Sequence, residues 1–157
     1  MIVFSNTTPF IALSVINKLD LLPSIFEEIH VADSVIRECS EGGKIMVPDL
    51  SSLDWVISHN DLDNTMLPIL LELDRGEKQT IALALKEKDS LVIIDEKIGR
   101  NIAEYMGLKV VGTLGVLVKA KRLKMIDSFK DEVYCMLEAG IRYHQGLIER
   151  IILELGE

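Results

Sequence analysis

Four side chains that end in an amide or a carboxylate stand where short apolar runs stop or where helices begin. They are Asn6, Glu38, Glu77 and Asp95. Asn6 follows the apolar run at residues 2–5, and Asp95 follows the run at residues 91–94. In an open α/β sheet the carboxyl ends of the strands face the crevice where ligands bind. Carboxylates gathered there repel one another, so a bound cation is the natural reason to assemble them.

The elements that would position these side chains alternate between strands and helices. Strands are expected at residues 2–5, 28–32, 55–58 (at a sheet edge), 91–94 and 109–111. Helices are expected at residues 9–17, 20–27, 34–39, 76–87, 97–106, 113–124, 127–138 and 144–155, and in part of 62–73. Thr7 or Thr8 is the expected N-cap of the first helix, and Thr113 that of the helix at 113–124. This alternation predicts a three-layer α/β/α domain with a central parallel sheet.

Length and composition narrow the class of protein. The chain has 157 residues, the size of one ordinary domain, and 48% of them are hydrophobic, enough to fill one core. Residues 1–157 are therefore expected to form a single domain. The formal net charge of −8 argues against a nucleic-acid coat protein, which would carry a broad basic face. The aromatic fraction of 5% argues against base-stacking platforms.

Other features of the sequence indicate a cytoplasmic protein. No apolar stretch reaches the ~18 residues that span a bilayer, and the N-terminus shows no secretory signal. The two cysteines, Cys39 and Cys135, are expected to be buried small hydrophobic side chains in a reducing compartment. Neither cysteine stands at zinc-ligand spacing from a second Cys or a His. We therefore expect no membrane contact and no zinc site.

Blocks of the sequence resemble one branch of the PIN-domain family. Residues 5–13, Ser-Asn-Thr-Thr-Pro-Phe-Ile-Ala-Leu, resemble the Ser-Asp-Thr-Ser-Pro-Leu-Ile-Ala-Leu opening of that branch. Further blocks agree in order and spacing with the second acidic position, the Gly-Glu helix, and the final acidic strand with its following helix. These three blocks lie at residues 35–38, at residues 73–84, and at residues 93–100 together with 112–117. Four blocks in the family's order make the resemblance fairly specific, and they span residues 2–125.

This resemblance implies a metal-dependent nuclease, usually of RNA and often a toxin paired with an antitoxin. Carried over by position, the family's acidic quartet falls on Asn6, Glu38, Glu77 and Asp95. Such a cluster would hold Mg²⁺ or Mn²⁺ through carboxylates and waters. The metal would activate a water and offset charge at the phosphate during an in-line displacement. The partners that the resemblance implies are single-stranded RNA and an antitoxin-type protein.

Asn6 stands where the family pattern has Asp. The amide is isosteric with a carboxylate and can still coordinate a cation, but without a full charge. A charge about 4 Å from a divalent ion is worth about 8 kcal/mol at an effective dielectric of 20, before desolvation. Two functions therefore stay open: an endoribonuclease weakened by Asn6, or a catalytically inactive PIN-fold module that binds nucleic acid or a protein partner. A small-molecule or phosphate-binding α/β domain is a third, weaker reading.

Each member of the quartet also has an ordinary structural explanation. Glu38 fits a solvated helix surface, and Glu77 fits the first turn of a helix, where a carboxylate favours the dipole. Asp95 would cap the helix that begins near Lys97. Asn6 would close an Asx-turn before the first helix.

A hydroxyl and several cations are candidates for substrate binding. Thr8 would meet a metal-bound water or a phosphate if it does more than cap its helix. Arg100, about one turn after Asp95, would meet a substrate phosphate or be an ordinary surface residue. Lys119 and Lys121 belong to the strongest basic run, most of which falls in the last turn of its helix, where cations suit the dipole.

The last expected helix is unusually aliphatic. Residues 147–153, Leu-Ile-Glu-Arg-Ile-Ile-Leu, add an apolar excess for a chain of this size. Such a face predicts a homodimer or a groove for a partner, unless the helix simply packs onto the sheet.

Overall fold

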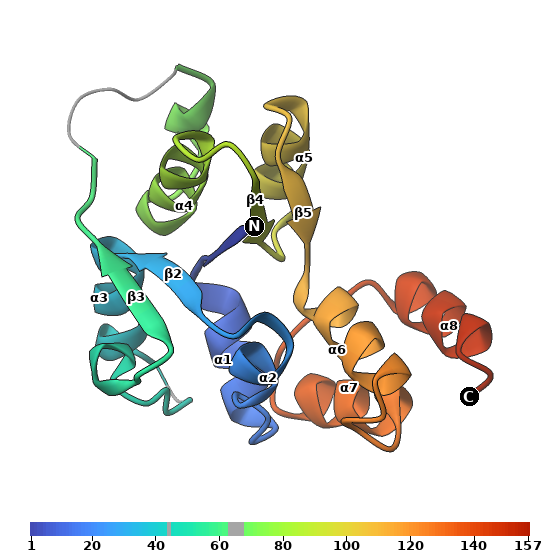
Figure 1. Ribbon diagram of the computed structural model, residues 1–157. Coiled ribbons are helices and arrows are strands. Elements are labelled where there is room, and N and C mark those ends of the chain that lie inside the picture. The colour runs from blue at the N-terminus through green and yellow to red at the C-terminus, as the bar shows by residue number, and fades with distance from the viewer. Residues whose placement is uncertain (44, 63–67) are drawn as a thin grey trace.

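A parallel five-stranded sheet forms the centre of the molecule, with the strand order β3-β2-β1-β4-β5 (Figure 1). The computed structural model describes residues 1–43, 45–62 and 68–157. The strands are β1 (Ile2–Ser5), β2 (Ile29–Ala32), β3 (Val56–His59), β4 (Ser90–Ile93) and β5 (Lys109–Val111). Every neighbouring pair runs parallel, as the alternation of strands and helices predicts.

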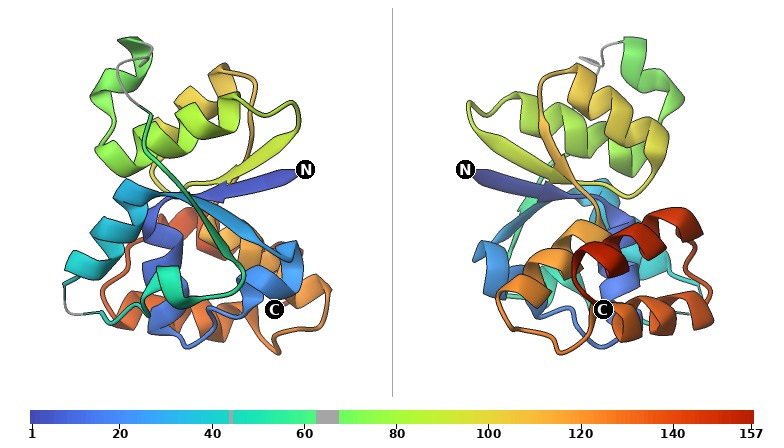
Figure 2. Two further views of the ribbon diagram at one scale, coloured as in Figure 1. Left: turned by 60° about the vertical axis from the view of Figure 1, so that its left-hand side comes forward. Right: turned by 90° about the vertical axis from the view of Figure 1, so that its right-hand side faces the viewer.

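Helices cover both faces of the sheet, which makes the fold a three-layer α/β/α structure (Figure 2). On one face lie α4 (Arg75–Leu85) and α5 (Lys97–Tyr105). On the other lie α1 (Thr7–Val15), α6 (Thr113–Arg122) and α7 (Phe129–Glu138). The remaining helical segments are α2 (Leu21–Phe26), α3 (Asp33–Glu41), α8 (Gln145–Glu154) and the 3-10 turns η1 (Leu50–Ser52) and η2 (Pro68–Glu72).

The core lies between the sheet and these two helical layers. Successive residues of the central strands are buried, as Val3 and Phe4 of β1 and Val92 and Ile93 of β4 show. Both faces of a parallel sheet are covered, so its central strands carry consecutive apolar residues instead of a strict alternation. This burial keeps the central strands rigid beneath the residues that follow them.

The register of the central strands brings two distant parts of the chain to the same edge. Ser5 at the end of β1 lies opposite Ile93 at the end of β4. Asn6 and Asp95 therefore leave the sheet at neighbouring points. The chain pairs β1 with β2 on one side and with β4 on the other. Such a reversal of strand order is the place where open α/β sheets form their ligand crevice.

Most expected elements are present, with boundary shifts of a few residues. The third strand is an edge strand, as expected, and runs one residue later than predicted. Within 62–73, η2 is a short 3-10 turn, and residues 63–67 lie outside the described part of the chain. No helix in the described ranges is long and apolar enough to cross a membrane.

Three local predictions were wrong. The first helix begins at Thr7, so its N-cap position is Asn6 and not a threonine. The N-cap of α6 is Gly112, because the Thr113 side chain bonds elsewhere.

Cys39 is buried, as expected, and burial raises the pKa of its thiol to about 12. Cys135 is exposed instead, because it lies on the outer side of α7.

Candidate active site

Asn6 occupies the turn between β1 and α1. Its backbone N–H donates to the carbonyl oxygen of Ile93, at 3.3 Å, which ties the ends of β1 and β4 together. The residue is 4% exposed, and its side chain makes no capping hydrogen bond. No donor among the described residues reaches its Oδ1. The Asx-turn expected as the ordinary explanation of Asn6 is therefore not what holds this side chain.

Glu38 extends from α3 to the N-terminus of α4. Its Oε2 accepts a hydrogen bond from the Thr7 hydroxyl, and its Oε1 accepts one from the Gly76 N–H at 3.1 Å. A Cβ at Gly76 would lie only 2.7 Å from Oε2, so the absence of a side chain there makes this approach possible. The positive end of the α4 dipole favours a carboxylate at this position. Glu38 is thus a half-buried, bonded group instead of a solvated one.

Asp61 holds α3 and α4 together beside these carboxylates. Its Oδ2 pairs with Arg37 at 3.2 Å and with Arg75 at 2.9 Å. Arg37 precedes Glu38 on α3, and Arg75 begins α4 two residues before Glu77. The ion pairs therefore hold the two helices at the distance that brings Glu38 and Glu77 to one place.

Glu77 is the most deeply buried acid of the site, at 6% exposed. Its backbone N–H donates to Asp74 Oδ1 at 2.9 Å, which caps α4. Its Oε2 is buried and accepts no hydrogen bond from the described residues. This oxygen packs against Gly99, where an added Cβ would lie only 2.4 Å from it. Burial, followed by the negative charges of Asp74, Glu96 and Glu38, raises the pKa of Glu77 to about 8.

Asp95 follows β4 and receives three hydrogen bonds from distant parts of the chain. Its Oδ1 accepts from the Thr113 N–H at 2.6 Å, and its Oδ2 accepts from the Thr113 hydroxyl at 2.7 Å. The Tyr143 hydroxyl also donates to Oδ2, at 3.1 Å. Burial and the nearby Asp95 charge raise the pKa of Tyr143, so its hydroxyl keeps its proton. The helix cap expected of Asp95 is supplied by Glu96, which accepts from the Gly99 N–H at 2.9 Å.

The structure therefore gathers the predicted quartet along one edge of the sheet but gives its members different neighbours. Asn6, Glu38 and Glu77 are linked through Thr7 and the start of α4. Asp95 is bonded to Thr113 and Tyr143 instead. Within the described ranges, no three His, Cys, Asp or Glu side chains lie in ligand geometry around one point.

Sequence reasoning did not assign Thr7, Thr113 or Tyr143 to the site. The sequence predicts the two threonines only as helix caps. Their hydroxyls instead orient Glu38 and Asp95. Tyr143 lies 48 residues after Asp95 and belongs to none of the motif blocks, so no local pattern could have identified it.

The candidate substrate contacts are placed in three different surroundings. Thr8 lies half-buried in the first turn of α1, and Arg100 lines a cavity that also contains Asp95. Lys119 lies over the Phe26 ring, 5.7 Å from its centre. Lys121 donates to the Asp127 carbonyl and forms an ion pair with Glu157 at 3.7 Å. Eight residues of helix place Lys121 about 12 Å along α6 from Thr113, so the structure does not bring it to Asp95.

Comparison with known proteins assigns the chain to a family. A family model described as PIN domain matches residues 2–157. The chain belongs to the PIN-domain family. Among solved structures, a PilT N-terminus domain protein from the hyperthermophilic archaeon Sulfolobus solfataricus P2 has a similar fold, with a TM-score of 0.56 and 16% sequence identity. That similarity covers 92% of this chain and 100% of the other and shows the fold alone. No curated protein matches the chain significantly.

PIN domains are in general nucleases and typically depend on a divalent metal ion. Such an ion requires ligands of a suitable chemical type at this site. The donors here are all oxygens, the type that Mg²⁺ and Mn²⁺ prefer. Asn6 Oδ1 and Glu77 Oε2 are buried and have no protein donor among the described residues, as expected of oxygens that face a cation. Mg²⁺ keeps several waters and needs only one or two direct carboxylates. The donors of this PIN domain therefore fit a hydrated divalent ion in chemical type, while no three acids within the described ranges surround one point.

Proposed function

We propose that this PIN-domain protein is an endoribonuclease that depends on Mg²⁺ or Mn²⁺ and is slowed by Asn6. The observation that carries the proposal is that two buried oxygens, Asn6 Oδ1 and Glu77 Oε2, have no hydrogen-bond partner among the described residues. A buried polar atom without a partner costs about 1–3 kcal/mol, so its presence calls for a ligand. Both atoms belong to residues that the PIN-domain resemblance places in the acidic quartet.

Each residue of the site has a role in this proposal. Glu38, Glu77 and Asp95 would hold the ion, with Asn6 as an uncharged fourth oxygen. When bound, the ion lowers the pKa of a coordinated water and offsets charge on the phosphate. Arg100, on the wall of the Asp95 cavity, would bind a substrate phosphate.

The orienting hydroxyls belong to the same proposal. Thr7 holds Glu38, and Thr113 and Tyr143 hold Asp95, so these carboxylates are in position before substrate arrives. Orientation in advance saves reorganisation during the reaction. These residues are positioning groups in the proposal and do not contact the reacting atoms.

Cleavage of single-stranded RNA in the presence of Mn²⁺ or Mg²⁺ tests the proposal. The parent is expected to cut slowly, and the triple variant Glu38→Ala/Glu77→Ala/Asp95→Ala is expected to lose that activity. Glu104→Ala, an exposed acid on α5, is the matched control and should cut like the parent. Identical behaviour of the parent and the triple variant would refute the proposal.

Asn6→Asp separates the enzyme from its alternative, a PIN-fold module that binds nucleic acid or a protein without cutting. Restoring a charge next to the ion should raise affinity for Mn²⁺ by about tenfold or more, by the Coulomb argument. If the parent is inactive and Asn6→Asp cuts RNA, the natural protein is a degraded enzyme. Calorimetric titration of Mn²⁺ into the parent, Asn6→Asp and Asp95→Ala measures how each change alters the affinity for the metal ion.

The proposed enzyme has two candidate protein partners, an antitoxin-type protein and a second copy of the chain. A toxin role with an antitoxin-type protein stays a prediction, as does a homodimer through the last helix. Ile148 of α8 is buried, whereas Leu153 is 83% exposed and Leu147 is 37% exposed. The aliphatic helix thus uses part of its apolar face within the chain and leaves part free. Analytical ultracentrifugation of the parent and Leu153→Glu would decide whether that free part joins two copies.

A further inference from the structure

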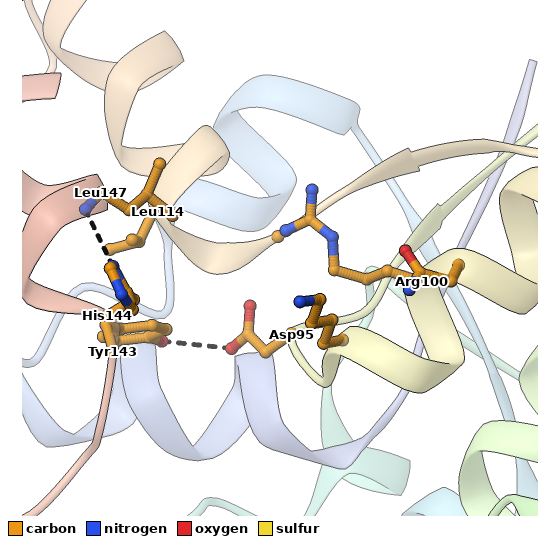
Figure 3. Close-up of a pocket in the computed structure, with 9 residues that line it drawn as sticks. Asp95, Arg100, Leu114, Tyr143, His144 and Leu147 are labelled. Atoms are coloured by element: carbon orange, nitrogen blue, oxygen red, sulfur yellow. Dashed lines mark hydrogen bonds between the residues drawn. The ribbon is translucent and has the colours of Figure 1, made fainter. Parts of the chain in front are cut away.

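A cavity of about 360 Å³ lies between the residues after β4 and the segment that enters α8 (Figure 3). Asp95 forms part of its floor, so the cavity opens directly beside the proposed catalytic edge. Its volume is near the lower end of the ~300–1,000 Å³ typical of small-molecule sites. One ring system with a small polar group would fill it.

The α5 side of the cavity is cationic. Arg100 is half-buried and Lys97 is exposed, and both line the cavity. Neither cation forms an ion pair with a carboxylate within the described ranges. A Cβ on Gly112 would lie 2.6 Å from Arg100 Nη1, so the backbone leaves room for the guanidinium there. Two cations without an ion-pair partner among the described residues favour an anionic ligand at this place.

The opposite wall is apolar and aromatic. Tyr143 precedes α8, His144 is its N-cap and Leu147 lies in its first turn, whereas Leu114 comes from α6 (Figure 3). The Tyr143 ring is fixed because its hydroxyl donates to Asp95. The His144 ring is fixed because its Nδ1 accepts from the Leu147 N–H, at 3.3 Å, as the N-cap of α8.

These hydrogen bonds also set the polar character of the wall. With Nδ1 as an acceptor, the neutral His144 ring carries its proton on Nε2 and offers a donor. The exposed Asn101 amide, on the rim, offers both a donor and an acceptor. Donors and acceptors beside a fixed aromatic ring suit the edge and face of a flat heterocycle.

We propose that this cavity binds one nucleobase of the RNA substrate next to the scissile phosphate and so sets the sequence preference of cleavage. The proposal rests on the proposed nuclease function. Tyr143, His144 and the two leucines would contact the base, Asn101 would read its edge, and Arg100 would bind the adjoining phosphate. An aliphatic peptide would leave the cations unpaired, and a free phosphate would leave the aromatic wall unused. A nucleotide uses both sides.

The low aromatic content of the chain does not conflict with this proposal. A stacking platform along an extended strand needs several rings, and 5% aromatic residues argue against it. A single pocket needs one or two rings in fixed positions. Base–aromatic stacking contributes enough that losing one ring should weaken binding about tenfold.

The first experiment measures binding without cleavage. Each of the four nucleoside 5′-monophosphates is titrated into metal-free protein while NMR follows the methyl groups of Leu114 and Leu147. At least one nucleotide should shift both leucines saturably, and ribose 5-phosphate should not. Absence of a saturable shift with all four nucleotides, or equal shifts with ribose 5-phosphate, would overturn the nucleobase assignment.

His144→Asn is the variant of choice because Asn is a strong N-cap, so α8 keeps its cap while the ring is lost. Nucleotide affinity should fall about tenfold in His144→Asn, because the stacking ring is gone. It should stay at the parent value in Tyr105→Ala, which removes an exposed aromatic from α5 outside the cavity. Equal affinity in the parent and His144→Asn would overturn the proposal.

The second experiment uses a degenerate single-stranded RNA pool and sequences the cut ends. The parent should prefer one base at a fixed position beside the cut, and His144→Asn should flatten that preference. Cleavage without any preference would overturn the pocket while leaving the nuclease intact. Nucleotide binding without any cleavage would overturn the nuclease proposal while leaving the nucleobase pocket intact. The two proposals can therefore fail separately.

Discussion

Glu77 has a carboxyl that is costly to ionise in the folded protein. Its side chain is buried beside Gly99, and three other acids lie near enough to raise its pKa to about 8. At neutral pH the metal-free site therefore holds a proton on Glu77. A divalent cation at the same place would displace that proton, since an ion of opposite charge favours the carboxylate. Metal binding by this site should thus release protons and weaken below neutral pH.

The raised pKa of Glu77 predicts that the metal-free protein loses stability as pH rises. In the unfolded chain this carboxyl has its ordinary value of 4.5, whereas in the fold it titrates near pH 8. Between these values the folded state binds more protons, so the free energy of unfolding falls with increasing pH. Glu77→Gln should remove that slope and stabilise the protein by roughly 4 kcal/mol at about pH 8.5.

Urea unfolding at a series of pH values, in EDTA, measures this slope. Glu104→Gln, on an exposed position of α5, is the control and should follow the parent at every pH. If the parent and Glu77→Gln have parallel stability curves, Glu77 is ionised in the metal-free fold and this prediction is wrong.

At the scale of single elements, helix N-termini organise much of the molecule. Glu38 lies at the start of α4, Glu96 caps α5 and His144 caps α8. The start of α7 is capped by two side chains, those of Ser128 and Glu157. In each case a backbone N–H that would otherwise lack a partner is satisfied. Caps from distant residues also fix how neighbouring helices meet.

Glu157 should stabilise the α7–α8 pair through such a cap. Its carboxylate accepts from the Phe129 N–H at 2.9 Å, the Lys130 N–H at 3.1 Å and the Ser128 hydroxyl at 2.8 Å. Burial opposes its charge, but these hydrogen bonds outweigh burial and hold the pKa of Glu157 below its usual value. Glu157→Ala should therefore lower the free energy of unfolding by about 1 kcal/mol at neutral pH.

Thermal unfolding near pH 7 and at about pH 2 tests the cap. A depressed carboxyl pKa contributes stability that is lost as pH falls through the folded value, so the effect of Glu157→Ala should shrink at the lower pH. Glu154→Ala, an exposed acid in the last turn of α8, should have no comparable effect. Equal losses at both pH values would mean that Glu157 acts by packing and not by its charge.

At the scale of the whole molecule, the proposed function requires an acidic chain to bind an acidic polymer. The net charge of −8 repels RNA at long range, so binding depends on the few cations near the site and on a metal ion. Arg100 and Lys97 line the Asp95 cavity, whereas Lys119 and Lys121 are engaged near the far end of α6. The proposed RNA contact is therefore local.

The salt dependence of RNA binding should be shallow. With two phosphate contacts, the slope of log K against log salt for a single strand should be about −1.4. Fluorescence anisotropy with a short labelled RNA measures the slope for the parent, Arg100→Ala and Lys119→Ala/Lys121→Ala. Arg100→Ala should reduce the slope by about half, and the double lysine variant should leave it unchanged. A steep parent slope that the double variant lowers would place the RNA along α6 instead.

Local patterns in the sequence predicted most of the elements and marked the four residues of the quartet as candidates. The apolar runs at β1 and β4, the Gly-Glu start of α4 and the polar residues after the strands are all readable within a few residues. Hydrophobic periodicity and turn chemistry act over that range. The parallel three-layer fold followed from their order along the chain, and the PIN-domain match supports the same assignment.

Only the tertiary structure decided how the quartet is surrounded. Tyr143 reaches Asp95 across 48 residues, and Glu157 reaches Phe129 across 28. It also shows that one buried oxygen of Asn6 and one of Glu77 lack a hydrogen-bond partner in the part of the chain that the structure describes. Strand order and helix packing determine which distant side chains meet, and a hydrogen bond requires atoms within about 3 Å of each other. No local sequence pattern specifies distances between segments so far apart, so these contacts appear only when the sheet and its two helical layers are assembled.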